Sequence, residues 1–352
     1  MKTIDSTSLE QVEGYAGHSV ATSKRSLGVV IVSLVLLAGV LLTSGHQPRH
    51  SASKAKPAAV LARHIGQQKM ISSLERQGVG FGSCPHGASM QIVAHPDDDI
   101  LFMNPDIAED IQAKKCSTTI YVTAGDNGDG MEYVSQREVG IKSAYAQMAG
   151  LPIDQAWAEK PVHASGKTIQ IAALEGGVPI QLIFMRLYDG NVQGAGYDGR
   201  PTSLALSSKN NVPIGSMDDA TRISTKALEN LLAALVHVYT PDTVRTHALS
   251  GAGDHSDHMA TGKVTRIAME KYKESRESFP TKSKANPVFF LYDGYPIRGM
   301  QTNISGQQEE AKRAFFYAYA VHDSHICPDG CIEGTGSYED YLSRQYKNQA
   351  TP

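Results

Sequence analysis

From about residue 88, short apolar runs alternate with longer segments in which apolar residues recur every three or four positions. The short runs are rich in β-branched residues and predict strands, whereas the longer periodic segments predict helices. The predicted strands are Met90–Ala94, Thr118–Thr123, Ile180–Met185, Thr243–Ala248 and Val288–Tyr292. The predicted helices are Ile100–Lys114, Tyr133–Ala149, Ala220–Val238, Ser256–Tyr272 and Gln307–Ala320. This alternation favours an α/β fold of the Rossmann-like, three-layer α/β/α kind, with a mostly parallel sheet covered by helices on both faces.

A longer apolar run near the start of the chain has a different character. Ser26–Gly45 comprises 20 residues without a charge, and a helix of that length spans a hydrocarbon core of about 30 Å. We interpret residues 26–45 as a transmembrane signal anchor that follows an N-terminal tail, residues 1–25. Two alternatives stay open, a buried core helix and a signal peptide cleaved near Thr43–Gly45.

The chain after this run divides into a connecting part and one large domain. Residues 46–57 are rich in Ser, Lys, Ala, Pro and His and are typical of a linker. Residues 58–77 have helical spacing and predict a helix at the edge of the domain. The predicted units are therefore a linker with an edge helix, 46–78, and a domain, 79–347.

Charge is distributed unevenly between these parts. Residues 1–78 hold nine Lys and Arg against four Asp and Glu, a net of +5, so the other residues hold 24 against 32, a net of −8. An acidic domain argues against nucleic acid as a partner, because such binding depends on neutralising phosphates.

Polar clusters follow three of the predicted strands. His95 and Asp98 come after the first strand, Asp126 after the second, and His255 and His258 after the strand Thr243–Ala248. In doubly wound sheets ligands bind beyond the carboxyl ends of the strands, so these side chains are expected to meet. Two histidines and one carboxylate suit Zn²⁺ with a water ligand, or Fe²⁺. The alternative is that the aspartates and His255 only cap the helices that follow them.

The same residues resemble the motifs of a known family. Ala94–Asp99 resembles the A-H-P-D-D-E signature of the PIG-L/LmbE-like zinc N-deacetylases, and His255–His258 resembles their H-x-D-H motif. Thr123–Asp126 is similar to their T-x-G-[DE] segment, and Arg137 falls on a segment similar to their arginine-bearing helix. The resemblance covers roughly residues 88–320.

The resemblance implies a role for each matching residue. The implied zinc ligands are His95, Asp98 and His258. The implied catalytic residues are Asp97 as general base, His255 as oxyanion stabiliser and Asp257 as the group that orients His255. The implied substrate-binding residues are Arg137 and Asp126. The chain departs from the family pattern at three positions. Asp99 replaces a Glu, Gly253 stands where some members have a Tyr, and Gly140 stands where the arginine-bearing helix usually has a Glu.

The four cysteines predict two disulfides. Cys84 and Cys116 each precede one of the first two strands, and Cys327 and Cys331 close a small turn. Even pairing indicates an oxidising compartment, which places the domain outside the cytoplasm, at the cell surface or secreted if the signal is cleaved. The alternatives are a second zinc site with His322 and His325, or free thiols in the cytosol.

Together these features predict a zinc-dependent amidohydrolase that removes the N-acetyl group from a 2-acetamido sugar in a glycan or glycoconjugate. Its predicted partners are that N-acetylated sugar and, through residues 26–45, a membrane. The alternatives are a non-catalytic glycan-binding protein on the same fold and a metal hydrolase of another amide or acyl substrate.

Overall fold

The computed structural model describes residues 52–278, 286–327 and 338–352. The predicted tail and signal anchor, residues 1–45, lie outside the described residues, so the anchor stays a prediction. In the part of the chain that the structure describes, every helix is too short or too polar to cross a membrane.

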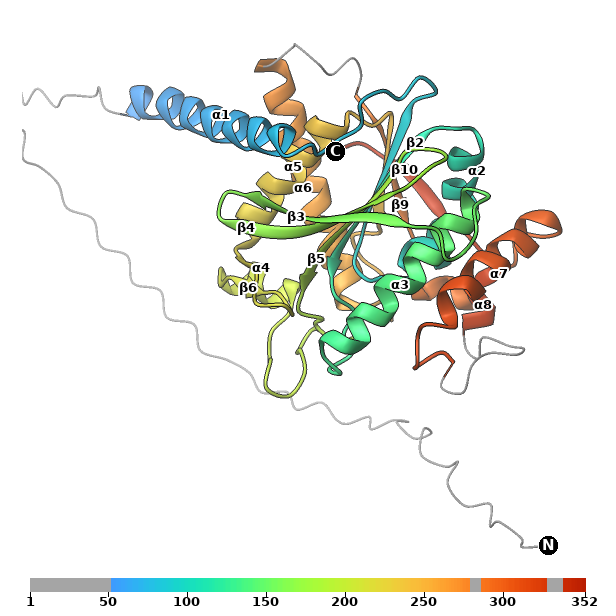
Figure 1. The fold of residues 1–352 in the computed structure, drawn as a ribbon. Helices are drawn as coiled ribbons and strands as arrows, with labels where there is room; N and C mark the ends of the chain where they lie inside the picture. The colour runs from blue at the N-terminus through green and yellow to red at the C-terminus, as the bar shows by residue number, and fades with distance from the viewer. Residues whose placement is uncertain (1–51, 279–285, 328–337) are drawn as a thin grey trace, which may run out of the picture. The chain divides into compact units, whose positions relative to one another are not determined.

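The described residues contain one large mixed sheet (Figure 1). Its strands, in spatial order, are β10 (Lys347–Ala350), β9 (Val288–Tyr292), β8 (Thr243–His247), β1 (Ala88–Val93), β2 (Cys116–Thr123), β5 (Ile180–Leu187), β4 (Lys167–Leu174) and β3 (Trp157–Ala164). The five strands from β9 to β5 are parallel, and the strands outside them pair antiparallel. The predicted α/β fold with a mostly parallel sheet is confirmed.

Helices cover both faces of this sheet, as predicted (Figure 1). One apolar core lies under α1 (Ala52–Arg76), α4 (Leu204–Asn210), α5 (Thr225–Tyr239) and α6 (Ser256–Ser278). The other lies under α2 (Asp106–Gln112), α3 (Met131–Met148), α7 (Gln307–Ala320) and α8 (Glu339–Leu342). The remaining elements are a π-helical turn η1 (Asp99–Met103), a 3₁₀ turn η2 (Tyr295–Gly299) and the short strands β6 (Ile214–Gly215) and β7 (Arg222–Ile223). β1 and β2 are buried at every position, which explains why their sequences are not amphipathic.

The predicted helix Ile100–Lys114 is wrong as a single element. It is divided into η1 and α2, because Pro105 has no N–H to donate and disfavours helical backbone at Asn104. The buried Asn104 side chain instead accepts a hydrogen bond from the Ala108 N–H, 3.2 Å away, and so caps α2.

Two of the predicted element boundaries are wrong, the start of α5 and the end of the linker. α5 begins at Thr225 rather than at Ala220, because the Ser224 hydroxyl accepts the Ala227 N–H and caps the helix there. The predicted linker 46–57 overlaps α1, which already begins at Ala52.

The antiparallel strands at the two edges of the sheet were not predicted. β3 is largely exposed and carries Glu159, Lys160 and Pro161, so it lacks an apolar run. β3 and β4 are joined by Ser165 and Gly166, whose φ angles of 51° and 75° are those of a tight hairpin turn.

A disulfide joins Cys84 and Cys116, with the two Cα atoms 5.7 Å apart. Cys116 begins β2, and Ala88 pairs with it from the start of the neighbouring strand β1. The predicted pairing of Cys84 with Cys116 is therefore confirmed. The other predicted pair includes Cys331, which lies outside the described residues.

Candidate metal and catalytic site

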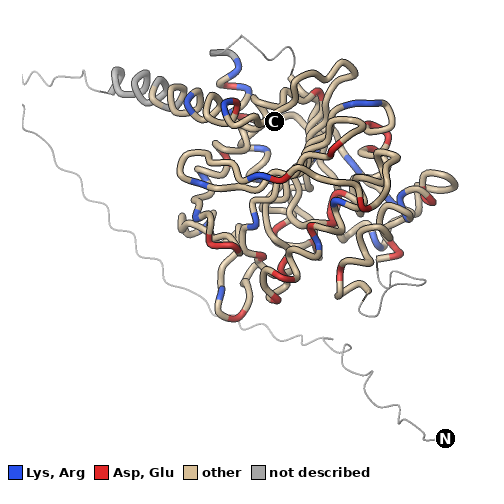
Figure 2. Tube along the Cα trace, in the orientation of Figure 1, with Lys and Arg blue, Asp and Glu red and all other residues tan. Residues whose placement is uncertain are grey.

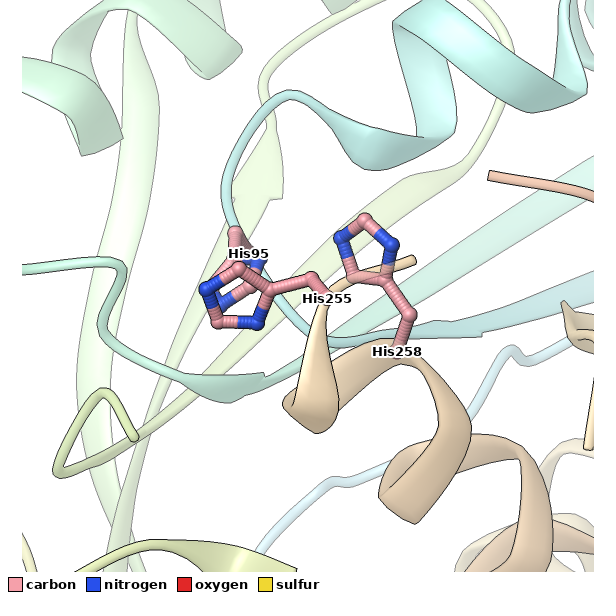
Figure 3. Close-up of side chains that lie close together, drawn as sticks. All are labelled: His95, His255 and His258. Carbon is pink, nitrogen blue, oxygen red and sulfur yellow. The ribbon is translucent and has the colours of Figure 1, made fainter. Parts of the chain in front are cut away.

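The predicted site residues meet beyond the carboxyl ends of the central strands β8, β1 and β2, because these strands are adjacent and parallel. The turn after β1 carries His95, Asp97 and Asp98, and the first turn of α6 carries His258. Figure 3 shows the His95 ring, on the segment after β1, facing the rings of His255 and His258 from the start of α6. The six residues 95, 97, 98, 255, 257 and 258 are all buried.

Asp98 lies at the centre of this cluster. Its Oδ1 is 2.9 Å from His258 Nε2, and its Oδ2 is 3.4 Å from His95 Nδ1. Its Oδ2 also accepts the His95 backbone N–H at 2.6 Å, which fixes the turn. Burial opposes ionisation of Asp98, but the neighbouring rings of His258, His95 and His247 hold its pKa well below its usual range.

His247 is a fourth histidine of the cluster, which the sequence reading missed. Its Nε2 lies 3.1 Å from Asp98 Oδ2, and its ring stacks on His258 with centroids 4.3 Å apart and planes 1° apart. It is the last residue of β8, so its position at a strand end was the available signal.

The side chains of the cluster fit a metal ion. His95 Nε2 is buried and has no hydrogen-bond partner, which is costly unless another ligand satisfies it. His258 Nε2 is also buried and lies against the Asp98 carboxylate, 2.9 Å from Oδ1. Asp254 Oδ1 lies 2.8 Å from His258 Nδ1, an arrangement that commonly fixes a metal-binding imidazole. Within the described residues, ligand atoms gather in three groups: His95, His255 and His258; Asp98, His247 and His258; and His95, Asp189 and Asp257.

Asp97 lies beside the cluster and faces Arg137 of α3. Its Oδ2 is 2.8 Å from Arg137 Nη2, and its φ of 158° is one that residues with a side chain rarely adopt. Burial raises the pKa of Asp97 to about 7, against the opposing effect of the Arg137 guanidinium. A carboxyl group of this kind can take and release a proton near neutral pH.

Asp99, the residue that replaces the family's Glu, points away from the cluster. Its Oδ2 accepts hydrogen bonds from the hydroxyls of Tyr121 and Tyr145, each at 2.7 Å. Burial raises its pKa to about 6. Asp99 therefore belongs to a buried polar group between η1, β2 and α3.

His255 and Asp257 both lie in the cluster, but their side chains face different partners. Asp257 Oδ2 accepts the Gly190 N–H at 2.7 Å and lies 3.6 Å from His95 Nε2. The Asp257 backbone N–H donates to His255 Nδ1 at 3.2 Å. Burial and the neighbouring histidines His95 and His258 strongly lower the pKa of His255, so its imidazole is neutral in this environment.

Asp126 is buried and holds a loop over the site. Its Oδ1 accepts the Asp189 N–H at 3.0 Å, and its Oδ2 pairs with Arg200 Nη2 at 2.8 Å. The loop 189–200 follows β5 and brings Asp189 to 3.9 Å from both His95 Nε2 and His255 Nε2. Asp189 was not predicted, although it too follows a strand.

A polar cavity of about 370 Å³ opens next to this loop. It is lined by Asn127, Gly128, Asp129, Asn191, Gly196, Tyr197 and Asp198. Asn127 follows Asp126 in the chain and Asn191 lies two residues after Asp189, so the cavity adjoins the cluster. A larger cavity of about 640 Å³ lies between α1, α5 and α6 and contains none of the cluster residues.

Basic residues do not gather on one side of the described chain. Figure 2 shows Lys and Arg interspersed with Asp and Glu over the helices and loops around the sheet. Close to the cluster, Arg137 and Arg200 are each paired with an aspartate, Asp97 and Asp126 respectively.

The fold and the cluster define an α/β protein with a buried histidine–aspartate centre beyond the carboxyl ends of its parallel strands. The family model described as PIG-L: GlcNAc-PI de-N-acetylase matches residues 90–269, just over half of the 352 residues. The chain belongs to this family. No curated protein sequence matches it.

Three solved structures are similar at 12% sequence identity each. The N,N'-diacetylchitobiose deacetylase from Pyrococcus horikoshii has a TM-score of 0.38, with 78% of this chain and 81% of that chain covered. The zinc-inhibited form of the teicoplanin deacetylase Orf2 has a TM-score of 0.40, with 72% and 90% covered. GalB, a 4-carboxy-2-hydroxymuconate hydratase from Pseudomonas putida KT2440, has a TM-score of 0.39, with 72% and 82% covered.

Proposed function

We propose that this chain is a zinc-dependent hydrolase that removes the N-acetyl group from a 2-acetamido sugar in an N-acetylglucosamine-containing glycan or glycoconjugate. One observation carries the proposal: the buried, unpartnered Nε2 of His95 and the buried Nε2 of His258 lie beside the carboxylates of Asp97 and Asp98, in a chain of the PIG-L family.

His95, Asp98 and His258 are the residues that would hold the metal. Zinc bound by two histidines and a carboxylate lowers the pKa of a water ligand to about 7 and polarises an acyl oxygen. Fe²⁺ suits the same donor set.

The other residues supply proton transfer and charge stabilisation. Asp97, which lies beside the metal ligands and pairs with Arg137, accepts the proton of the attacking water as the base. His255 donates a hydrogen bond to the oxygen on which negative charge develops, and the proton held by Asp97 leaves with the amine. The overall reaction converts the N-acetylated sugar and one water molecule into acetate and a free 2-amino sugar.

The test is an acetate-release assay with N-acetylglucosamine, N,N'-diacetylchitobiose and N-acetylated glycoconjugates. We expect turnover that a chelator removes and added Zn²⁺ restores. Asp97→Asn should lower kcat by about 100-fold or more while zinc content and thermal unfolding stay unchanged.

Asp110→Asn is the matched control, because Asp110 is another buried aspartate paired with an arginine, Arg245, outside the cluster. It should keep wild-type kcat. Near-full activity of Asp97→Asn would refute the base assignment. Saturable glycan binding without acetate release would favour the non-catalytic alternative.

We also propose that the domain works outside the cytoplasm, held at the membrane by residues 26–45 or secreted after cleavage. The disulfide between Cys84 and Cys116 supports this location, because disulfides persist in oxidising compartments. Thiol titration of the denatured, unreduced protein should find no free thiol. Four titratable thiols in protein taken from its native source would contradict the proposal.

A further inference from the structure

The side chain of Arg137 is enclosed by protein groups on all sides. Nη1 donates to Gly125 O at 2.6 Å, and Nη2 donates to Pro96 O at 2.9 Å and pairs with Asp97 Oδ2 at 2.8 Å. Nε donates to the Tyr319 hydroxyl at 2.6 Å. With 7% of its surface exposed, Arg137 connects α3 to the turns after β1 and β2.

The turn after β2 is shaped around this guanidinium. Gly125 has a φ of 59°, and a Cβ atom there would lie 2.1 Å from Arg137 Nη1. A side chain at residue 125 is therefore excluded by the position of Arg137. The strained Asp97 is held from the same side, because Arg137 binds both its carboxylate and the preceding carbonyl of Pro96.

A second carboxylate, Asp323, lies on the other side of Arg137. Its Oδ2 is 3.1 Å from Arg137 Nε and accepts the Tyr319 hydroxyl at 2.5 Å. Its Oδ1 accepts the Tyr133 hydroxyl at 2.7 Å. Asp323 is 1% exposed and follows α7, so it lies beyond residues 90–269, the segment matched by the family model.

We propose that Asp323 is a positioning residue for catalysis: together with Tyr319 it fixes the Arg137 guanidinium, which in turn holds the carboxylate of Asp97 in place. The inference rests on the proposed function, in which Asp97 is the base. It assigns Arg137 to the support of Asp97 rather than to sugar binding.

The physical reason is the sharing of one buried cation between two carboxylates. Without the charge of Asp323, Arg137 keeps only Asp97 as a carboxylate partner in the described structure and is drawn toward it. A base must lie within about 3 Å of the proton it takes, and a displacement of about 1 Å can cost about 100-fold in rate. Each donor nitrogen of Arg137 already has a protein partner, so we expect binding of the sugar to stay unchanged.

The test compares the kinetics of Asp323→Asn and wild type on the same N-acetylated sugar. We expect kcat to fall by about 10-fold to 100-fold, with KM changed less than about 3-fold and zinc content unchanged. Tyr319→Phe keeps the ring and removes the hydroxyl that bridges Arg137 and Asp323, so it should lower kcat in the same way by a smaller factor. It also keeps the proposal testable if Asp323→Asn does not fold.

Asp110→Asn is again the control, because it breaks a buried aspartate–arginine pair of the same kind on α2. An equal loss of kcat in this control would assign the effect to general destabilisation. A raised KM with unchanged kcat would overturn the proposal, because it would place Arg137 on the substrate.

A crystal structure of the variant separates failure of this inference from failure of the proposed function. In Asp323→Asn, or in Tyr319→Phe if the first variant does not fold, the Arg137 guanidinium should have shifted relative to Asp97. An unchanged Arg137–Asp97 pair would overturn the inference even if no acetate-releasing substrate is found.

Discussion

The carboxylate of Asp254 holds the imidazole of His258, with Oδ1 2.8 Å from Nδ1. This contact leaves Nε2 of His258 facing Asp98, 2.9 Å from its Oδ1. The same oxygen of Asp254 accepts the backbone N–H groups of His255 and Tyr295, at 2.9 and 3.1 Å. Asp254 therefore sets the ring orientation and the start of α6 together.

Asp254→Asn should weaken zinc binding by about 10-fold to 100-fold, the usual effect of losing the carboxylate behind a metal-binding histidine. The amide oxygen can still accept the two backbone N–H groups, so the fold should persist. Competition with a chromophoric chelator measures the affinity. Asp293→Asn is the control, since its carboxylate is near Asp254 but does not contact His258 in the described structure. Equal losses in both variants would argue against this role.

Two helical glycines should respond in opposite ways to alanine. At Gly140, a Cβ atom would lie 2.7 Å from the backbone oxygen of Tyr319, where α3 packs against α7. Gly140→Ala should therefore destabilise the fold by about 1–3 kcal/mol. At Gly66 in α1 nothing lies within 4 Å of the added atom, so Gly66→Ala should stabilise by about 0.5–1 kcal/mol.

Denaturant unfolding of these two variants measures both changes in the free energy of unfolding. A stabilised Gly140→Ala variant would show that α7 can move away from α3. The same contact leaves no room at residue 140 for the Glu that the resemblance implies: Tyr319 occupies the space that such a side chain needs.

The disulfide between Cys84 and Cys116 should contribute about 3–4 kcal/mol to the free energy of unfolding, because it closes a loop with a sequence separation of 32. Cys84→Ser/Cys116→Ser should lose this amount in denaturant unfolding. A reductant should lower the stability of wild type further than that of the double variant. Equal sensitivity of both proteins to the reductant would mean that this disulfide adds no stability.

The strands at the centre of the sheet were predictable because burial on both faces favours runs of uncharged, β-branched and apolar residues, as in Thr118–Thr123. The edge hairpin β3–β4 was not, because exposed strands need no such run and β3 carries Glu159 and Lys160. Pro105 indicates a break before α2, but the helical periodicity of the residues around it led to the prediction of one continuous helix.

In the candidate site, residues within short sequence motifs were predicted. His247, Asp189 and Asp323 lie outside such motifs and were not predicted. His95 and Asp98 lie three residues apart, so their proximity is a property of the sequence. His247 reaches Asp98 across 149 residues, and Asp323 lies 186 residues after Arg137. Such contacts depend on strand order and on the packing of α7 against α3, which spacing along the chain does not encode.

His237 gives the fold a specific sensitivity to acid. Burial, with a smaller effect from Arg276, lowers its pKa from 6.5 to about 4, and its Nε2 lies 2.5 Å from the Ser275 hydroxyl. The unfolded chain therefore binds a proton at this residue at a higher pH than the folded chain does. The associated stability is fully present above pH 6.5 and is lost as the pH falls toward 4, by at most about 3 kcal/mol.

His237→Gln removes the titrating group and keeps a polar end near Ser275. Carboxylates titrate in both proteins, so the informative quantity is the difference between their free energies of unfolding at pH 7 and at pH 5. We expect wild type to lose more stability than His237→Gln over this range, because only wild type must keep a buried imidazole neutral. Parallel pH profiles for the two proteins would mean that His237 is protonated in the fold without cost and that its burial does not depress its pKa.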